Sequence, residues 1–220
     1  MTVSVTARLA LTVVFAFLAA CASAQAPPDQ PAGTTADPDA DVPQPELGAV
    51  RECLLQVKDS TRQHAVSVLL SLDGAGAVTE AHVERIKIRD PALEACVAAA
   101  ARPWRFGKLH GAKLRMSIGL DPGRDHAELS TSRCGGAMCP SLAAWMGCAR
   151  NVRHADLTVR ALIDPTGAPV AAAAVRADID VSDRPRVTAC FIHQQLECRC
   201  PPDADGAYLL IQNRFTADRG

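Results

Sequence analysis

The chain has 220 residues, with 23 Lys and Arg against 24 Asp and Glu, so its net charge is close to zero. This balance gives no long-range field to attract nucleic acid, and one tyrosine with five phenylalanines offers no platform for stacked bases. Nine cysteines are many for a reduced compartment and indicate either an oxidising compartment or bound metal.

The N-terminus predicts export. Arg8 precedes an apolar run, residues 9–20, that is short for a membrane span and has the length of a signal-peptide core. Leu18-Ala-Ala-Cys21 resembles the lipobox of bacterial lipoproteins, in which Cys21 would be lipidated, whereas Ala22-Ser-Ala24 is an ordinary cleavage site. We expect a signal peptide over residues 1–21 and a lipoprotein in the periplasm or outer membrane of a Gram-negative bacterium. The alternative is a soluble periplasmic or secreted protein cleaved after Ala24.

Residues 22–45 are rich in Pro, Asp, Ala and Thr and have no periodic apolar face, so we expect a disordered tether. An amphipathic helix is predicted next, near residues 45–57, with Val50, Cys53 and Leu54 on one side.

Residues 66–83 predict two antiparallel strands. The first alternates apolar residues from Val66 to Leu72, and Asp73-x-x-Gly76 forms a tight turn into the second strand. Asp90 and Pro91 then predict the start of a helix. Trp104 and Phe106 follow as core anchors, and a third strand is expected around Leu114.

Most of this pattern recurs about ninety residues later, which predicts a duplicated unit of helix, strand, strand, helix, strand. One insertion near Pro169 is needed to align the second strands. The aligned positions are Val50, Cys53, Leu54 and Val57 with Trp145, Cys148, Ala149 and Val152; Val66, Val68, Leu70 and Leu72 with Leu157, Val159, Ala161 and Ile163; Asp73 and Gly76 with Asp164 and Gly167; Val78, Ala81 and Val83 with Val170, Ala173 and Val175; Leu93, Cys96 and Val97 with Val187, Cys190 and Phe191; and Leu114 with Tyr208.

Eight cysteines remain after either cleavage. Cys53 and Cys96 each lie on the apolar side of a helix, and Cys148 and Cys190 repeat the arrangement, so we predict the disulfides Cys53 to Cys96 and Cys148 to Cys190. The other four are expected to cross-link the second unit to the segment before it, in pairings left open. A four-cysteine zinc site is the rival interpretation, but its spacings fit poorly. These four are Cys134, Cys139, Cys198 and Cys200.

No constellation of catalytic residues stands out, and we predict no catalytic residue, cofactor or metal. The histidines do not recur between the units, and each is expected on a surface or in a linker. Asp73 and Asp164 do recur, but an aspartate that opens a turn bonds its own backbone. The histidines are His64, His82, His110, His126, His154 and His193.

The first unit resembles the TonB C-terminal domain in its strand, Asp-x-x-Gly turn, Asp90-Pro-Ala-Leu-Glu94 segment and Trp104-Arg-Phe106. With Cys53 and Cys96 it looks more like the related AgmX/PglI C-terminal domain. The resemblance implies an α+β fold with two helices on one face of a three-stranded antiparallel sheet. We expect one such unit over residues 46–120, a linker over 121–140 and a divergent second unit over 141–216.

The resemblance also implies a periplasmic, non-enzymatic role in which an extended peptide or protein partner pairs with a sheet edge. The membrane is contacted through the lipid anchor alone, and neither nucleic acid nor a small-molecule substrate is expected. The alternative function is a structural spacer in an envelope complex, which a closed interface between covered third strands would favour. We predict the third strands as the exposed edges, namely Lys113, Leu114, Arg115, Met116, Ser117 and Ile118, with Ala207, Tyr208, Leu209, Leu210 and Ile211.

Overall fold

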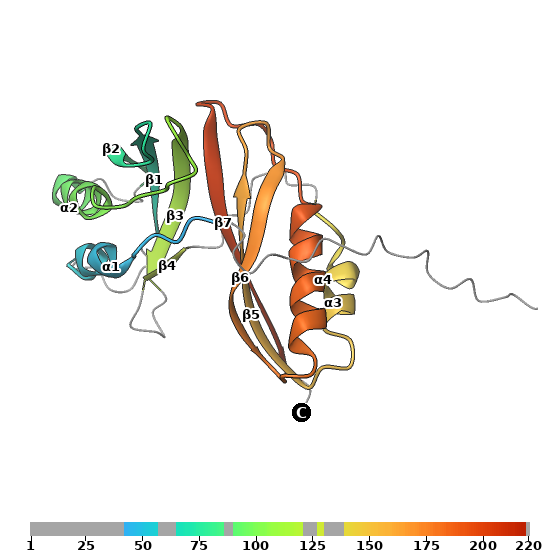
Figure 1. Cartoon of the computed structure of the whole chain (residues 1–220). Coiled ribbons are helices and arrows are strands. Elements are labelled where there is room, and N and C mark those ends of the chain that lie inside the picture. Colours follow the sequence, from blue (N-terminus) through green and yellow to red (C-terminus); the bar gives the residue numbers. More distant parts are fainter. Residues whose placement is uncertain (1–41, 57–64, 86–89, 121–126, 130–138, 219–220) are drawn as a thin grey trace, which may run out of the picture. The chain divides into compact units, whose positions relative to one another are not determined.

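The computed structural model describes residues 42–56, 65–85, 90–120, 127–129 and 139–218, all of which lie within the compact unit Thr35–Gly220. Helices and strands are interleaved, and the predicted α+β class is confirmed (Figure 1). The predicted signal peptide, Cys21 and most of the tether lie outside the described residues. In chain order the elements are α1 (Gly48–Leu55), β1 (Ala65–Leu72), β2 (Val78–Arg85), α2 (Pro91–Ala101), β3 (Lys113–Leu120), β4 (Ala127–Leu129), α3 (Leu142–Cys148), β5 (His154–Ile163), β6 (Pro169–Ile179), α4 (Arg184–Leu196) and β7 (Ala207–Asp218).

The first half folds as its pattern predicts. In β1, alternate residues from Val66 to Leu72 are buried, so one face of the strand packs on the core. At the start of α2, the Asp90 carboxylate accepts hydrogen bonds from the backbone N–H groups of Ala92 and Leu93 at 3.0 and 3.2 Å. Pro91 occupies the first turn, where its missing N–H is not needed. These local features place α2 directly after the first two strands.

The turn between the first two strands is built the same way in both halves. The backbone N–H of Phe106 donates to the carbonyl of Gly76 at 2.8 Å, and that of Cys200 donates to Gly167 at 2.9 Å. Both glycines have positive φ, 75° and 91°. A Cβ on either would collide with the carbonyl oxygen of the residue it pairs with. Glycine is therefore required at both turns.

β2 and β6 carry β-bulges at matching places. Ala81 pairs with Leu70 in the first half, and Ala172 pairs with Ala161 in the second. The predicted alignment is therefore wrong by one residue, because Ala81 corresponds to Ala172 and not to Ala173, and no insertion is needed. The extra residue at each bulge interrupts the alternation on which that alignment relied. The register shifts lie between Ser67 and Val68 and between Ser71 and Leu72 in β1, and between Thr158 and Val159 and between Leu162 and Ile163 in β5.

The described strands form one mixed sheet. Its order is β2-β1-β3-β7-β5-β6, with β4 paired to β3 off this path. β3 and β7 are parallel, with Lys113 opposite Ala207 and Met116 opposite Leu210. The structure thus differs from the prediction of two separate three-stranded sheets, because the third strand of each half pairs with that of the other. The predicted match of Leu114 with Tyr208 is also wrong, since the register against β1 and β5 equates Leu114 with Ile211.

Two cores lie on opposite faces of this sheet. The first contains side chains of α1, α2 and the first three strands, and it extends to Leu210 of β7. The second contains side chains of α3, α4 and β5, together with Ile211. Because successive residues of a strand point to opposite faces, β7 contributes to both cores. An aromatic group of Trp145, Phe191 and Phe215 fills the second core, and Trp145 and Phe215 stack with centroids 4.7 Å apart.

The two predicted helix-to-helix disulfides are confirmed, with Cα atoms 5.7 Å apart for Cys53 and Cys96 and 5.5 Å apart for Cys148 and Cys190. A third disulfide joins Cys139 to Cys198, so these two cysteines are not free thiolates for a metal. Cys200 is also disulfide-bonded. Cys134 lies outside the described residues.

Candidate functional site

The third strands, predicted as exposed edges, are interior strands, and this prediction is wrong. β3 has β1 on one side and β7 and β4 on the other, while β7 lies between β3 and β5. Each third strand supplies the pairing that the other would otherwise leave open, and this removes a liability of exposed edges. Of the predicted edge residues only Lys113 is exposed; Arg115, Ser117, Tyr208 and Leu209 are half-buried, and Leu114, Met116, Ile118, Ala207, Leu210 and Ile211 are buried.

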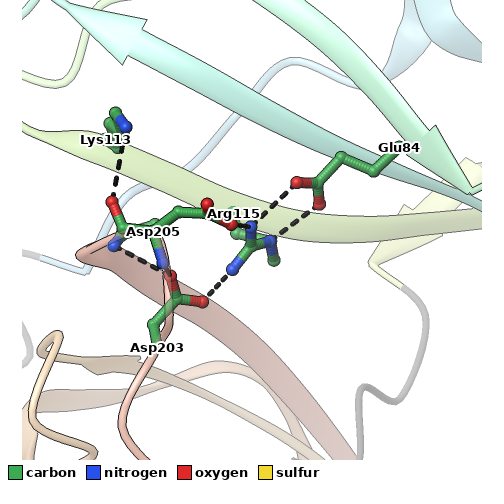
Figure 2. Close-up of polar contacts among 6 residues, drawn as sticks. Glu84, Lys113, Arg115, Asp203 and Asp205 are labelled. Atoms are coloured by element: carbon green, nitrogen blue, oxygen red, sulfur yellow. Dashed lines mark hydrogen bonds and ion pairs between the residues drawn. The ribbon is translucent and has the colours of Figure 1, made fainter.

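Where the third strands meet, polar residues form a group that we call the Arg115 cluster: Glu84, Lys113, Arg115, Asp203 and Asp205 (Figure 2). The Arg115 guanidinium donates to both carboxylate oxygens of Glu84, at 2.7 and 2.8 Å. It also donates to Asp205 at 2.6 Å and to Asp203. Hydrogen bonding to Glu84 raises the pKa of Arg115 further above its ordinary value. Arg115 therefore stays charged and connects three carboxylates.

Asp203 also organises the segment that leads into β7. Its second carboxylate oxygen accepts the backbone N–H groups of Asp205 and Ala207 at 2.9 and 3.0 Å. Lys113 donates to the carbonyl of Asp205 at 3.4 Å. With these contacts the cluster joins β2 and β3 of the first half to the start of β7. Its carboxylates are already paired, so the arrangement suits a fixed junction between the halves better than proton transfer.

The outer strands of the sheet, β2 and β6, are paired on one side only within the described residues. β2 carries Glu80, His82 and Glu84, and charged side chains protect an edge against pairing. β6 carries four consecutive alanines, from Ala171 to Ala174, and Val170 is 53% exposed. Arg176 and Asp178 charge only the last part of β6, so residues 169–175 are the stretch of outer strand that an extended segment could approach with the least obstruction.

The described histidines are separate and exposed, and no group of His, Cys, Asp or Glu among the described residues could hold a metal ion. His64 and His126 lie outside the described residues. Asp73 and Asp164 have the predicted turn role. The backbone N–H of Ala77 lowers the pKa of Asp73, and the Thr166 hydroxyl is the largest cause that lowers the pKa of Asp164.

Sequence reasoning missed Arg160. It lies on the face of β5 opposite α3 and α4, and its guanidinium donates to the carbonyl of Pro43 at 3.2 Å and to the amide oxygen of Gln212 at 3.0 Å. Burial lowers the pKa of Arg160 to about 10. The alternation of β5 marks this residue as outward-facing, but nothing in the sequence signals that residues near Pro43 return to cover it. Arg160 therefore ties the segment before α1 to β5 and β7 of the second half.

Within the described residues, no helix is long and apolar enough to cross a membrane. Comparison of the chain with protein-family models, with curated proteins and with solved structures finds no match.

Proposed function

We propose that this chain is a non-enzymatic cell-envelope lipoprotein in which two TonB C-terminal-like units form one rigid body that serves as a spacer or accessory component of an envelope complex. The observation that supports this proposal most directly is the parallel pairing of β3 with β7, which leaves neither third strand free for a peptide. The Arg115 cluster supports a fixed junction between the halves, and one disulfide stiffens the helix pair of each half. Disulfides also accord with an oxidising compartment, and the N-terminal pattern supports export and a lipid anchor.

Photocrosslinking in the native envelope tests the spacer role. A photoreactive residue in place of Ser117 on β3, or of Leu209 on β7, should give only intramolecular products, because the junction stays closed. An intermolecular adduct from either position, recovered above the level of the unirradiated sample, would show that the third strands open to a partner and would contradict the proposal.

A second candidate function is binding of an extended peptide along β6, which would add a strand to the sheet. The observation that favours it is the first part of β6, residues 169–175, which has small uncharged residues and an exposed Val170. Thr79 is the matched control for Val170, because each is the extra residue of a β-bulge. Thr79 follows Val78 in β2, and Val170 follows Pro169 in β6. A photoreactive residue at Val170 should trap a partner that the same residue at Thr79 does not. Equal recovery from both positions would reject β6 as the binding edge.

A further inference from the structure

α3 presents an apolar face outward. Leu142 is 73% exposed and Met146 is 62% exposed, and they lie four residues apart on the same side of the helix. Ala143 and Gly147 beside them are exposed as well. The opposite side of α3 buries Trp145 and its neighbours in the second core. Two large apolar side chains on one short helical face are more than isolated exposure explains.

The fold does not require an exposed apolar pair there, because the first half does not expose one at the equivalent positions. α1 and α3 are aligned by Cys53 and Cys148, whose disulfides correspond. Counting back from these cysteines, Arg51 corresponds to Met146, and Leu47, which packs on the first core, corresponds to Leu142. The exposed apolar face is therefore specific to the second half.

Positive charge accompanies this face. From Cys139 to Ala155 the sequence contains no acidic residue. Arg150 lies just past the C-terminal end of α3, and Arg153 lies just before the start of β5; both are exposed. Neither guanidinium makes an ion pair or hydrogen bond with another described residue. Arg186 also lies at this end of α3, where it donates to the carbonyl of Cys148 at 3.4 Å, but its charge is paired with Asp183 at 2.9 Å and adds little to this face.

We propose that this surface, Leu142, Met146, Arg150 and Arg153, docks on an anionic lipid bilayer. Apolar side chains flanked by arginines match the interface of such a bilayer, where the apolar groups enter the headgroup boundary and the arginines meet lipid phosphates. Charge complementarity selects this occupant over a second copy of the chain, which would bring the same arginines together. The docking is separate from the spacer role and from any lipid at Cys21.

Vesicle flotation of the exported full chain carrying Cys21→Ser, which removes the candidate lipid anchor, tests the proposal. We expect binding to phosphatidylglycerol and phosphatidylcholine vesicles that falls with salt, and weak binding to phosphatidylcholine alone. The pair Arg150→Gln and Arg153→Gln should weaken binding about fivefold for each arginine. The pair Leu142→Gln and Met146→Gln should also weaken it, while Leu55→Gln, at an exposed apolar residue of α1, should leave it unchanged.

A folded-state readout accompanies flotation. In Leu142→Trp, emission should shift to the blue when phosphatidylglycerol vesicles are added. The proposal is overturned if the parent chain does not float with anionic vesicles and no shift occurs, or if the Leu142 and Met146 pair floats as well as Leu55→Gln. It is also overturned if the chain is a dimer by light scattering and the same pair makes it monomeric, because the face would then be a self-interface.

Discussion

Gln195 and Asn213 form a polar pair inside the second core. Gln195 on α4 is fully buried, and its side-chain oxygen accepts the amide of Asn213 on β7 at 2.6 Å. The corresponding residues of the first half are Ala101 and Met116, which are both fully buried. The two halves thus fill the same place by different chemistry, and the apolar solution leaves no polar atom to satisfy.

This difference predicts a stability cycle. Asn213→Met alone should destabilise the chain by about 1–3 kcal/mol, because the buried amide of Gln195 loses its partner. Adding Gln195→Ala reproduces the first half and should recover most of that loss. Chemical denaturation of the oxidised chain measures both variants. Equal stability of the single and double variants would show that the pair does not govern packing here.

Acid sensitivity follows from the turn aspartates. Hydrogen bonds lower the folded-state pKa of Asp73 and Asp164 below the unfolded value near 3.8, so the unfolded chain binds more protons at pH values between the two. The contribution to stability is fully present above about pH 4 and is lost as the pH falls through the folded pKa. Asp164→Asn should therefore differ from the parent most at neutral pH and least in acid. A gap in unfolding free energy that widens in acid would contradict this sign.

The segments that precede helices α1 and α3 are attached to their own halves by different kinds of bond, made from corresponding positions. In the first half the indole N–H of Trp104 donates to the carbonyl of Glu46 at 3.1 Å. In the second half Cys198 takes the position of Trp104 and bonds covalently to Cys139. The expectation that these cysteines cross-link the second unit to the segment before it is confirmed for this pair. The second half has its aromatic side chains elsewhere in its core, at Trp145, Phe191 and Phe215.

We expect the two attachments to differ in strength. Replacing Cys139 and Cys198 together by serine opens a bond with a sequence separation of 59 and should cost about 4 kcal/mol in the chain-entropy model. Trp104→Phe removes the hydrogen bond to Glu46 and part of a buried ring, and should cost about 2 to 3 kcal/mol. Thermal unfolding of both variants under non-reducing conditions provides the comparison. A larger loss for Trp104→Phe would reverse this ranking.

Local patterns predicted the elements of each half, the Asp90 cap and two disulfides, because these depend on neighbours in sequence or on one apolar helix face. The partner of β3 was not predictable in this way. A strand's alternation shows which of its faces is buried, but the same alternation fits an edge or an interior strand. The repeat alignment failed for a related reason. The bulges in β6, and the three extra residues between Cys190 and Ile211 compared with Cys96 and Leu114, leave no mark in the types of residue that define the pattern.

At the scale of the whole molecule, the shared sheet predicts joint unfolding of the two halves. The first core includes Leu162 and Leu210 from the second half, and Arg115 links three carboxylates across the junction. Calorimetry should therefore show a single unfolding transition in which both halves unfold together. Two separate transitions would indicate independent domains.

Arg115→Met tests the junction itself. It should lower the free energy of unfolding by roughly 2–3 kcal/mol, because half-buried carboxylates of Glu84 and Asp203 lose a charged donor. Lys113→Met is the matched control on the same strand. Among the described residues its ammonium reaches only the carbonyl of Asp205, and the change should stay within about 0.5 kcal/mol. Similar losses of unfolding free energy from the two substitutions would show that Arg115 stabilises the junction no more than Lys113 does.

The strand order reads the same from either outer strand inward, since β2, β1 and β3 mirror β6, β5 and β7. Two separate copies of one unit would produce this order by meeting at their third strands. Such a meeting depends on concentration, whereas joining the copies in one polypeptide supplies a fixed effective concentration of each for the other. Once association is guaranteed in this way, selection can alter one copy without losing the pair, and the differing cores of the two halves are what such freedom produces.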